Sequence, residues 1–68
     1  MALTERQKDI VELVKHGKSN AYIANKLSFG IRTVERELTE LFISFGVENR
    51  TSLVTQILKY ENRGYCDF

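Results

Sequence analysis

A stripe of side chains recurs at helical spacing in the middle of the chain. Its members stand at positions i, i+3, i+4, i+7 and i+11, and they are Arg32, Glu35, Arg36, Thr39 and Ile43. This spacing places them on one face of an α-helix, opposite the apolar residues Val34 and Leu38. An arginine can donate two hydrogen bonds to a guanine edge, and a glutamate can accept one from the amino group of cytosine. The stripe is therefore a candidate recognition face.

The same charges could instead serve the helix that carries them. Arg36 and Glu40 are spaced i, i+4 and could form a surface ion pair worth about 0.3 to 0.5 kcal/mol. Glutamates in a first helical turn also suit the helix dipole. From the residues alone, Glu35 is either a reader of bases or a solvated helix residue, whereas Glu37 and Glu40 lie off the stripe and are expected to face water.

Apolar periodicity and end signals predict four helices, over about residues 5–15, 20–27, 31–45 and 50–60. Thr4 followed by Gln7 is a capping box that starts the first helix, and Gly17 provides a stop after it. The third helix has the strongest apolar period. The other end signals are Ser19 or Asn20 before the second helix, Gly30 and Gly46 around the third, and Asn49 or Thr51 before the last.

No alternating run of β-branched residues competes with these helices, so the predicted fold class is all-α, a compact four-helix bundle. We expect one domain over residues 1–60 and an irregular tail over 61–68. The second and third helices are joined by a short turn that contains glycine. Such a pair is typical of a helix-turn-helix that enters a DNA groove, but also of an ordinary helical hairpin, and the pattern alone leaves both open.

Taken together, the motifs resemble a known family. The stretches "LTERQKDIVELVKHGKSNAYIANKL", "TVERELTELF" and "GVENRTSLV" carry the resemblance, which runs over residues 3–58 at a spacing that needs no alignment gap. They are similar to the LuxR-type (GerE-like) helix-turn-helix domain of bacterial transcription regulators, in a stand-alone form. The resemblance implies a protein that binds double-stranded DNA through its third helix in the major groove and dimerises through its fourth helix.

The resemblance also implies roles for particular residues. The base-reading positions fall on Glu35, Arg36 and Thr39, and Arg32 and Thr33 lie near phosphate. Helix starts, where free amides and a cation can together hold phosphate, add Lys18, Ser19, Asn20 and Arg50. The fourth helix retains an apolar edge that would form a twofold dimer interface from Thr51, Thr55 and Leu58, with Tyr60 as further apolar surface.

Departures from the family pattern motivate a second hypothesis. Where the family commonly has lysine and histidine in the third helix, this chain has Glu35 and Glu37, and Gly30 replaces a capping serine. The net charge is only +1. These features also fit a protein-interaction module that pairs with another LuxR-type regulator through the fourth helix, as a heterodimer, and has weakened or lost DNA binding.

Several other classes of protein are not supported by the sequence. No apolar run approaches the roughly 20 residues of a membrane span, and no signal-like segment opens the chain, so a cytoplasmic location is expected. No catalytic constellation, metal cluster or cofactor-binding motif is present, and we expect neither an enzyme nor a bound cofactor. The single cysteine, Cys66, is expected to be a reduced, solvent-facing thiol, with a redox role left open.

Overall fold

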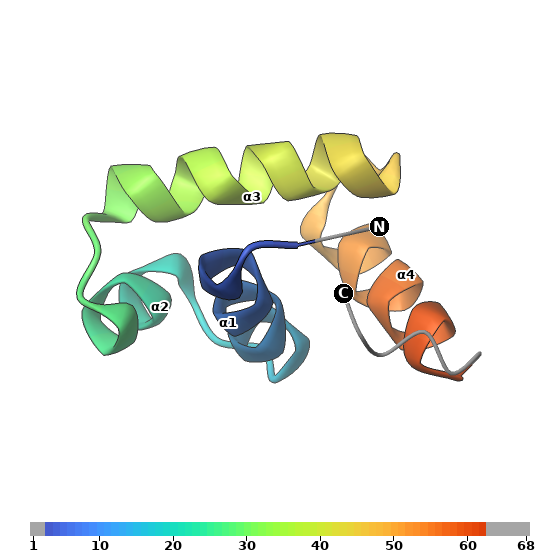
Figure 1. The fold of residues 1–68 in the computed structure, drawn as a ribbon, viewed down its shortest axis with the longest axis horizontal. Helices are drawn as coiled ribbons and strands as arrows, with labels where there is room; N and C mark the ends of the chain where they lie inside the picture. Colours follow the sequence, from blue (N-terminus) through green and yellow to red (C-terminus); the bar gives the residue numbers. More distant parts are fainter. Residues whose placement is uncertain (1–2, 63–68) are drawn as a thin grey trace.

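Four helices form the fold in the computed structural model, which describes residues 3–62. They are α1 (Glu5–Lys15), α2 (Asn20–Leu27), α3 (Ile31–Phe45) and α4 (Arg50–Asn62). No strand occurs among the described residues. α3 extends along one side of the molecule, and α2, α1 and α4 follow one another beneath it (Figure 1). The all-α prediction is confirmed, although α4 runs two residues beyond its expected end at residue 60.

The starts of α1 and α2 are set by side-chain caps. The Thr4 hydroxyl accepts a hydrogen bond from the Gln7 amide, and the Gln7 side chain accepts one from the Thr4 amide, both at 3.1 Å. The Ser19 hydroxyl accepts from the Tyr22 amide at 3.1 Å. Each cap satisfies amides that would otherwise lack a partner inside the helix. The capping box and the Ser19 cap predicted from the sequence are thus confirmed.

The ends of α3 and the start of α4 use different devices. Gly30 precedes α3 without any side-chain cap, and Gly46 ends the helix at φ 68°, a left-handed conformation that favours glycine. Of the two candidate caps for α4, Asn49 is the one used, since its side-chain oxygen accepts from the Ser52 amide at 2.8 Å. These devices let the chain leave α3 and re-enter a helix after only a few residues.

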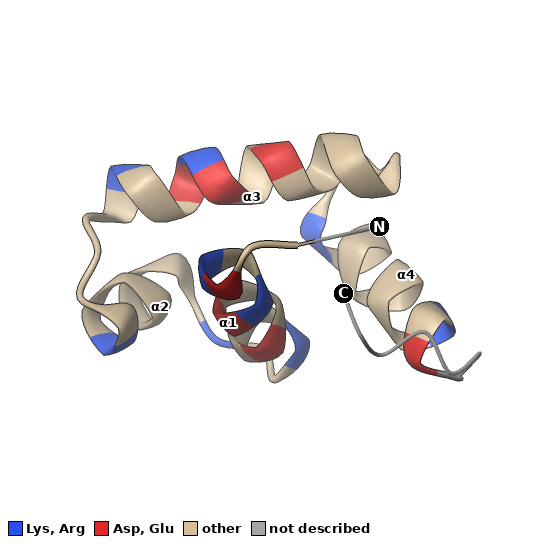
Figure 2. Ribbon diagram, in the orientation of Figure 1, with Lys and Arg blue, Asp and Glu red and all other residues tan. Residues whose placement is uncertain are grey.

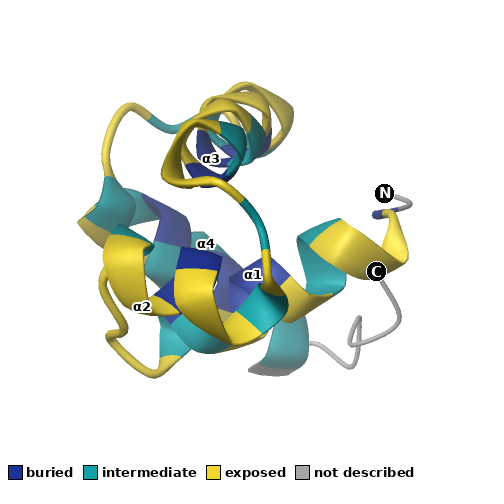
Figure 3. Cartoon of the chain, turned by 90° about the vertical axis from the view of Figure 1, so that its left-hand side faces the viewer, coloured by how far each residue is buried: buried dark blue, intermediate teal, exposed yellow. Residues whose placement is uncertain are grey.

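A single apolar core holds the helices together. α3 contributes Val34, Leu38 and Leu41, and α4 contributes Leu53 and Ile57, while α1 and α2 supply most of the remainder. Figure 3 shows buried positions on the inner sides of the helices and exposed positions on their outer sides. The back of the predicted recognition helix is therefore core, as the apolar spacing indicated.

Tyr60 is not free apolar surface, and that prediction is wrong. Its ring meets the ring of Phe45 edge-on, with centroids 5.6 Å apart and planes at 88°. This is a favourable geometry for two aromatic rings. Gly46 ends α3 between these two residues, and α3 and α4 pack against each other. Leu58, in contrast, is 45% exposed, as expected.

An ion-pair cluster joins the ends of α1 and α4. The ammonium of Lys15 lies 2.6 Å from a Glu61 carboxylate oxygen and 3.1 Å from one of Glu12. The hydrogen bond to Glu61, followed by that to Glu12, raises the pKa of Lys15 above its ordinary value of 10.5. The hydrogen bond from Lys15, followed by the contact with His16, lowers the pKa of Glu12 below 4.5. Lys15 thus ties two helices together.

Acid should weaken the fold partly through Glu12. Because its folded pKa lies below its unfolded value, its contribution is present above pH 4.5 and is lost as the pH falls through the folded pKa. Lys15→Met removes the main cause of the shift, so the unfolding free energy should decline less steeply in acid. We expect a difference below about 1 kcal/mol, since the Glu12 side chain is exposed and screened.

Urea unfolding followed by circular dichroism at neutral and acidic pH measures this decline. Lys59→Met is the matched control, because it removes the same charge from an exposed position outside the cluster. Equal acid dependence in the two variants would show that the Lys15 contacts do not contribute.

Candidate nucleic-acid interface

The outer face of α3 carries the stripe predicted from the sequence. Arg32, Glu35, Arg36 and Thr39 are all exposed, and Ile43 is 75% exposed. Figure 2 shows that the charges lie in the first part of α3, whereas its last turns are uncharged. A long exposed helix with a buried back is the shape that an element needs in order to enter a groove.

The two charged residues at the centre of this stripe have no partner within the described chain. Arg36 forms no ion pair with Glu40, so the i, i+4 pair considered from the sequence is not formed here. The carboxylate of Glu35 is likewise unpaired among the described residues. Both groups are available to an external ligand.

Thr39 is less free than its exposure indicates. Its hydroxyl donates a hydrogen bond of 3.0 Å to the backbone carbonyl of Glu35, one turn earlier. In that rotamer the hydroxyl proton is occupied within the helix. Thr39 can therefore offer an external ligand its oxygen lone pairs or its methyl group, but not its proton.

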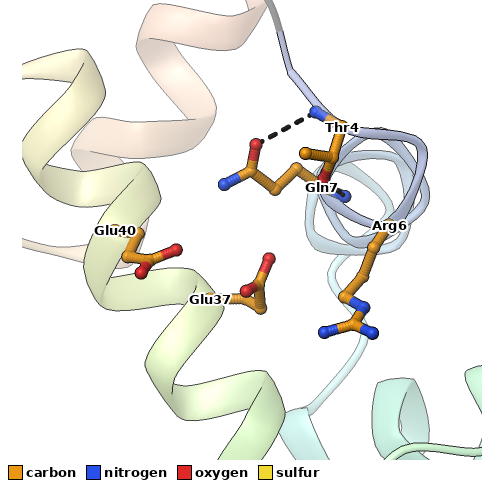
Figure 4. A pocket seen from close by; sticks show the side chains of 5 residues that line it. All are labelled: Thr4, Arg6, Gln7, Glu37 and Glu40. Atoms are coloured by element: carbon orange, nitrogen blue, oxygen red, sulfur yellow. Dashed lines mark hydrogen bonds between the residues drawn. The ribbon is translucent and has the colours of Figure 1, made fainter.

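The other two glutamates of α3 do not lie on this stripe. Glu37 and Glu40 line a surface hollow of about 350 Å³ beside the start of α1, together with Thr4, Arg6 and Gln7 (Figure 4). Glu40 is exposed as expected and Glu37 is half-buried, and both side chains line this hollow, which is open to solvent. The positive end of the α1 dipole favours negative charge at this place.

The turn between α2 and α3 is held from α1. Ser28 ends α2 in a left-handed conformation at φ 61°, and the Phe29 amide then donates to the Ala24 carbonyl at 2.9 Å. The Arg6 guanidinium lies over the Phe29 ring, 4.5 Å from its centroid. Sequence reasoning missed this cation–π contact, which helps to fix where α3 begins.

Four of the predicted phosphate-contacting residues meet at the start of α2. Lys18 and Ser19 are exposed, and the Lys18 ammonium lies 4.9 Å from the centroid of the Tyr22 ring. Arg50 reaches across from α4, where its guanidinium donates to the Asn20 side-chain oxygen at 2.7 Å and to the Lys18 carbonyl. The remaining two, Arg32 and Thr33, lie in the first turn of α3.

Arg50 is the residue whose surroundings differ most from the expectation. It was expected to contact phosphate, yet two of its donors are already bonded inside the protein and the side chain is half-buried. Its partners stand 30 and 32 positions earlier in the chain, so no local spacing could have signalled the contacts.

The predicted dimer residues share the outer face of α4. Thr51, Thr55 and Leu58 are all exposed and stand at i, i+4 and i+7. The Thr55 hydroxyl donates to the Thr51 carbonyl at 3.1 Å, which leaves its methyl group and oxygen outermost. The face is small and only partly apolar.

Within residues 3–62 there is no group of three or more side chains that could hold a metal ion. None of the helices described there is long and apolar enough to cross a membrane.

Comparison with known proteins identifies the family of the chain. Residues 1–57 match the family described as bacterial regulatory proteins, luxR family. The monoamine regulon transcriptional regulator of Klebsiella aerogenes is 39% identical over 54 residues, which are 79% of this chain and 24% of that protein. The response regulator Rre1 of Synechocystis is 35% identical over 57 residues, which are 84% of this chain and 25% of that protein.

A third relative, the oxygen regulatory protein NreC of Staphylococcus aureus, is 33% identical over 57 residues, covering 84% of this chain and 26% of that protein. The chain thus spans about a quarter of the length of these three relatives. No solved structure gives a significant match. The family and these relatives are described as regulators, not as enzymes. The chain belongs to the luxR family of bacterial regulatory proteins.

Proposed function

We propose that the chain is a transcription-regulator domain that binds double-stranded DNA, with α3 in the major groove. The observation that carries this proposal is the outer face of α3, where Glu35 and Arg36 are exposed and unpaired among the described residues while the back of the helix is core. The luxR-family match supports the same use of this face. The proposed domain comprises residues 1–60, and its place of action is the cytoplasm.

Base reading is assigned to the middle of the stripe. Arg36 can donate two hydrogen bonds to a guanine edge, and Glu35 can accept one from the amino group of a cytosine, so the pair suits a G·C-containing step. Thr39, with its proton bonded inside the helix, would contribute its lone pairs or its methyl group. This readout differs from the lysine that the family commonly places in this helix.

Phosphate contacts are assigned to two helix starts. Lys18 and Ser19 flank the first turn of α2, where backbone amides point outward and the helix dipole favours an anion. Arg32 and Thr33 stand in the first turn of α3, which lies at the edge of the reading face. Contacts of this kind fix the register of a protein on duplex DNA without reading its sequence.

We further propose that two copies pair through α4. Thr51, Thr55 and Leu58 share one exposed face, and a domain of this size gains stability from additional buried area. A twofold dimer would present two copies of α3 to half-sites about one helical turn of DNA apart. The expected operator is therefore a pseudo-palindrome.

Selection from random duplexes, followed by a salt titration of the selected site, tests the proposal. We expect one specific sequence and a slope of log affinity against log salt of about −3.6 for a dimer, at roughly 0.9 for each phosphate neutralised by Lys18 and Arg32 in the two copies. Fluorescence anisotropy at several salt concentrations measures the slope.

Absence of binding to any duplex at low salt would contradict the proposal. The alternative function is a protein-interaction module that pairs through α4 with another LuxR-type regulator, and the exposed carboxylate of Glu35 on the reading face favours it. Co-purification with such a regulator, together with loss of that regulator's DNA binding, would support the alternative.

A further inference from the structure

A single side chain connects the two parts of the molecule to which DNA binding and dimerisation are assigned. Arg50 is the first residue of α4, one position before Thr51 of the proposed dimer face. Its guanidinium donates to the Asn20 side-chain oxygen at 2.7 Å and to the Lys18 carbonyl, both at the start of α2. We call these two hydrogen bonds the Arg50 bridge.

We propose that Arg50 is a positioning residue that holds the start of α2 in the geometry required for phosphate contact, and that it does not itself neutralise a phosphate. The inference rests on the proposed DNA-binding function and assigns one residue of that interface a role through its neighbours. In this proposal Arg50 makes no direct contact with phosphate, in contrast to the role expected for it from the sequence.

The geometry of the bridge supports a positioning role. A guanidinium carries donors in a rigid planar fork, so two bonds to fixed acceptors restrain the backbone at Lys18 and the side chain of Asn20 together. Between these two residues stands Ser19, whose hydroxyl caps α2 through the Tyr22 amide. The Arg50 bridge therefore bonds to both chain neighbours of Ser19, the residue that caps α2.

The Arg50 bridge also affects the position of the Lys18 ammonium. With the Lys18 carbonyl bound to Arg50, the Lys18 side chain extends over the Tyr22 ring, 4.9 Å from its centroid. Its ammonium thus lies beside the side chain of a residue in the first turn of α2, the end of the helix at which an anion is favoured. Loss of the bridge should leave Lys18 charged but poorly placed.

Four variants test the role of Arg50, with DNA affinity measured by anisotropy on the selected duplex or, failing selection, on a mixed-sequence duplex at low salt. Arg50→Ala and Asn20→Ala should each weaken binding about tenfold, the effect of about 1.4 kcal/mol. The double variant should lose no more than the weaker-binding single variant, since both changes break one bridge. Arg50→Lys keeps the charge but cannot span both acceptors, and it should bind nearly as weakly as Arg50→Ala.

The salt slope separates positioning from direct contact. In a Lys18→Ala background, where the phosphate contact that the bridge positions is already absent, adding Arg50→Ala should leave the slope of log affinity against log salt unchanged, whereas a direct phosphate contact by Arg50 would reduce it by about 0.9 more per copy. Lys59→Ala is the matched control for charge, because it removes one exposed cation from the same helix. A further reduced slope when Arg50→Ala is added to Lys18→Ala, multiplying effects of Arg50→Ala and Asn20→Ala in their double variant, or wild-type affinity in Arg50→Lys would each overturn the proposal.

Amide hydrogen exchange at Tyr22 and Ile23 gives a readout that does not require DNA. Loss of the bridge should speed exchange in this first turn of α2 while helical content, measured by circular dichroism, is retained. If Arg50→Ala does not fold, Asn20→Ala alone carries the test, because it removes one acceptor and leaves the arginine in place. If the wild-type chain binds no duplex, the proposed function fails, and unchanged exchange in Asn20→Ala would overturn the bridge as well.

Discussion

Replacing Leu41 with alanine should remove most of the folding stability of the chain at room temperature. The Leu41 side chain is fully buried in the middle of α3, where it belongs to the core shared by the helices. Truncating a buried leucine costs about 2 to 5 kcal/mol, and a single core in a domain of this size rarely supplies more than about 3 to 5 kcal/mol. Far-UV circular dichroism and urea titration measure the loss directly.

Leu58→Ala is the matched control for the Leu41 variant. Leu58 is 45% exposed on α4, so the same truncation should change the unfolding free energy of the monomer by less than about 1 kcal/mol. A Leu41 variant as stable as the wild type would mean that α3 does not depend on the core that appears behind its exposed face.

The helix ends could be predicted from the sequence because the contacts that set them are local. The Thr4 and Gln7 side chains are three residues apart, and each caps the backbone of the other. Gly46 likewise takes the left-handed conformation that glycine after an apolar run indicates. Signals of this kind lie within one helical turn, so they require no knowledge of the tertiary fold.

The contacts that position the candidate interface could not be predicted in the same way. Arg50 bonds to residues near the start of α2, Arg6 lies over Phe29, and Tyr60 packs on Phe45. Each pair is separated by a stretch of chain whose path only the packed fold fixes. Helical periodicity was enough to predict that the stripe is exposed. It could not predict which polar side chains of the candidate interface are already hydrogen-bonded within the protein.

Glu37 shows the limit of periodicity within a single helix. Helical spacing correctly predicted that Glu37 lies outside the stripe, but the part of the α3 surface outside the stripe is not fully exposed to solvent. The start of α1 covers part of it, and Glu37 is half-buried there. The neighbour of a flanking position depends on how α1 crosses α3, which no spacing within α3 encodes.

Glu35→Lys should produce the largest change in DNA binding of any single substitution on the reading face. A carboxylate about 6 Å from a phosphate is repelled by roughly 3 kcal/mol at an effective dielectric near 20, before salt screening. Removing that repulsion and adding a cation should raise affinity for mixed-sequence duplex at least about tenfold, since each 1.4 kcal/mol is a factor of ten. The variant should also lose its preference for cytosine at one position of the selected site, and anisotropy with site variants measures both effects.

Glu40→Lys separates position from net charge. Glu40 is exposed on the same helix and undergoes the same change of charge, but it faces the start of α1 instead of the reading side. It should alter affinity less than Glu35→Lys and leave the base preference intact. Glu35→Gln refines the result, because it removes the charge while keeping an acceptor for the cytosine amino group. If Glu40→Lys changes the affinity and the base preference by the same amounts as Glu35→Lys, the position of Glu35 has no special role. Glu35 is then a solvated helix residue, and Arg36 reads the base without a contribution from Glu35.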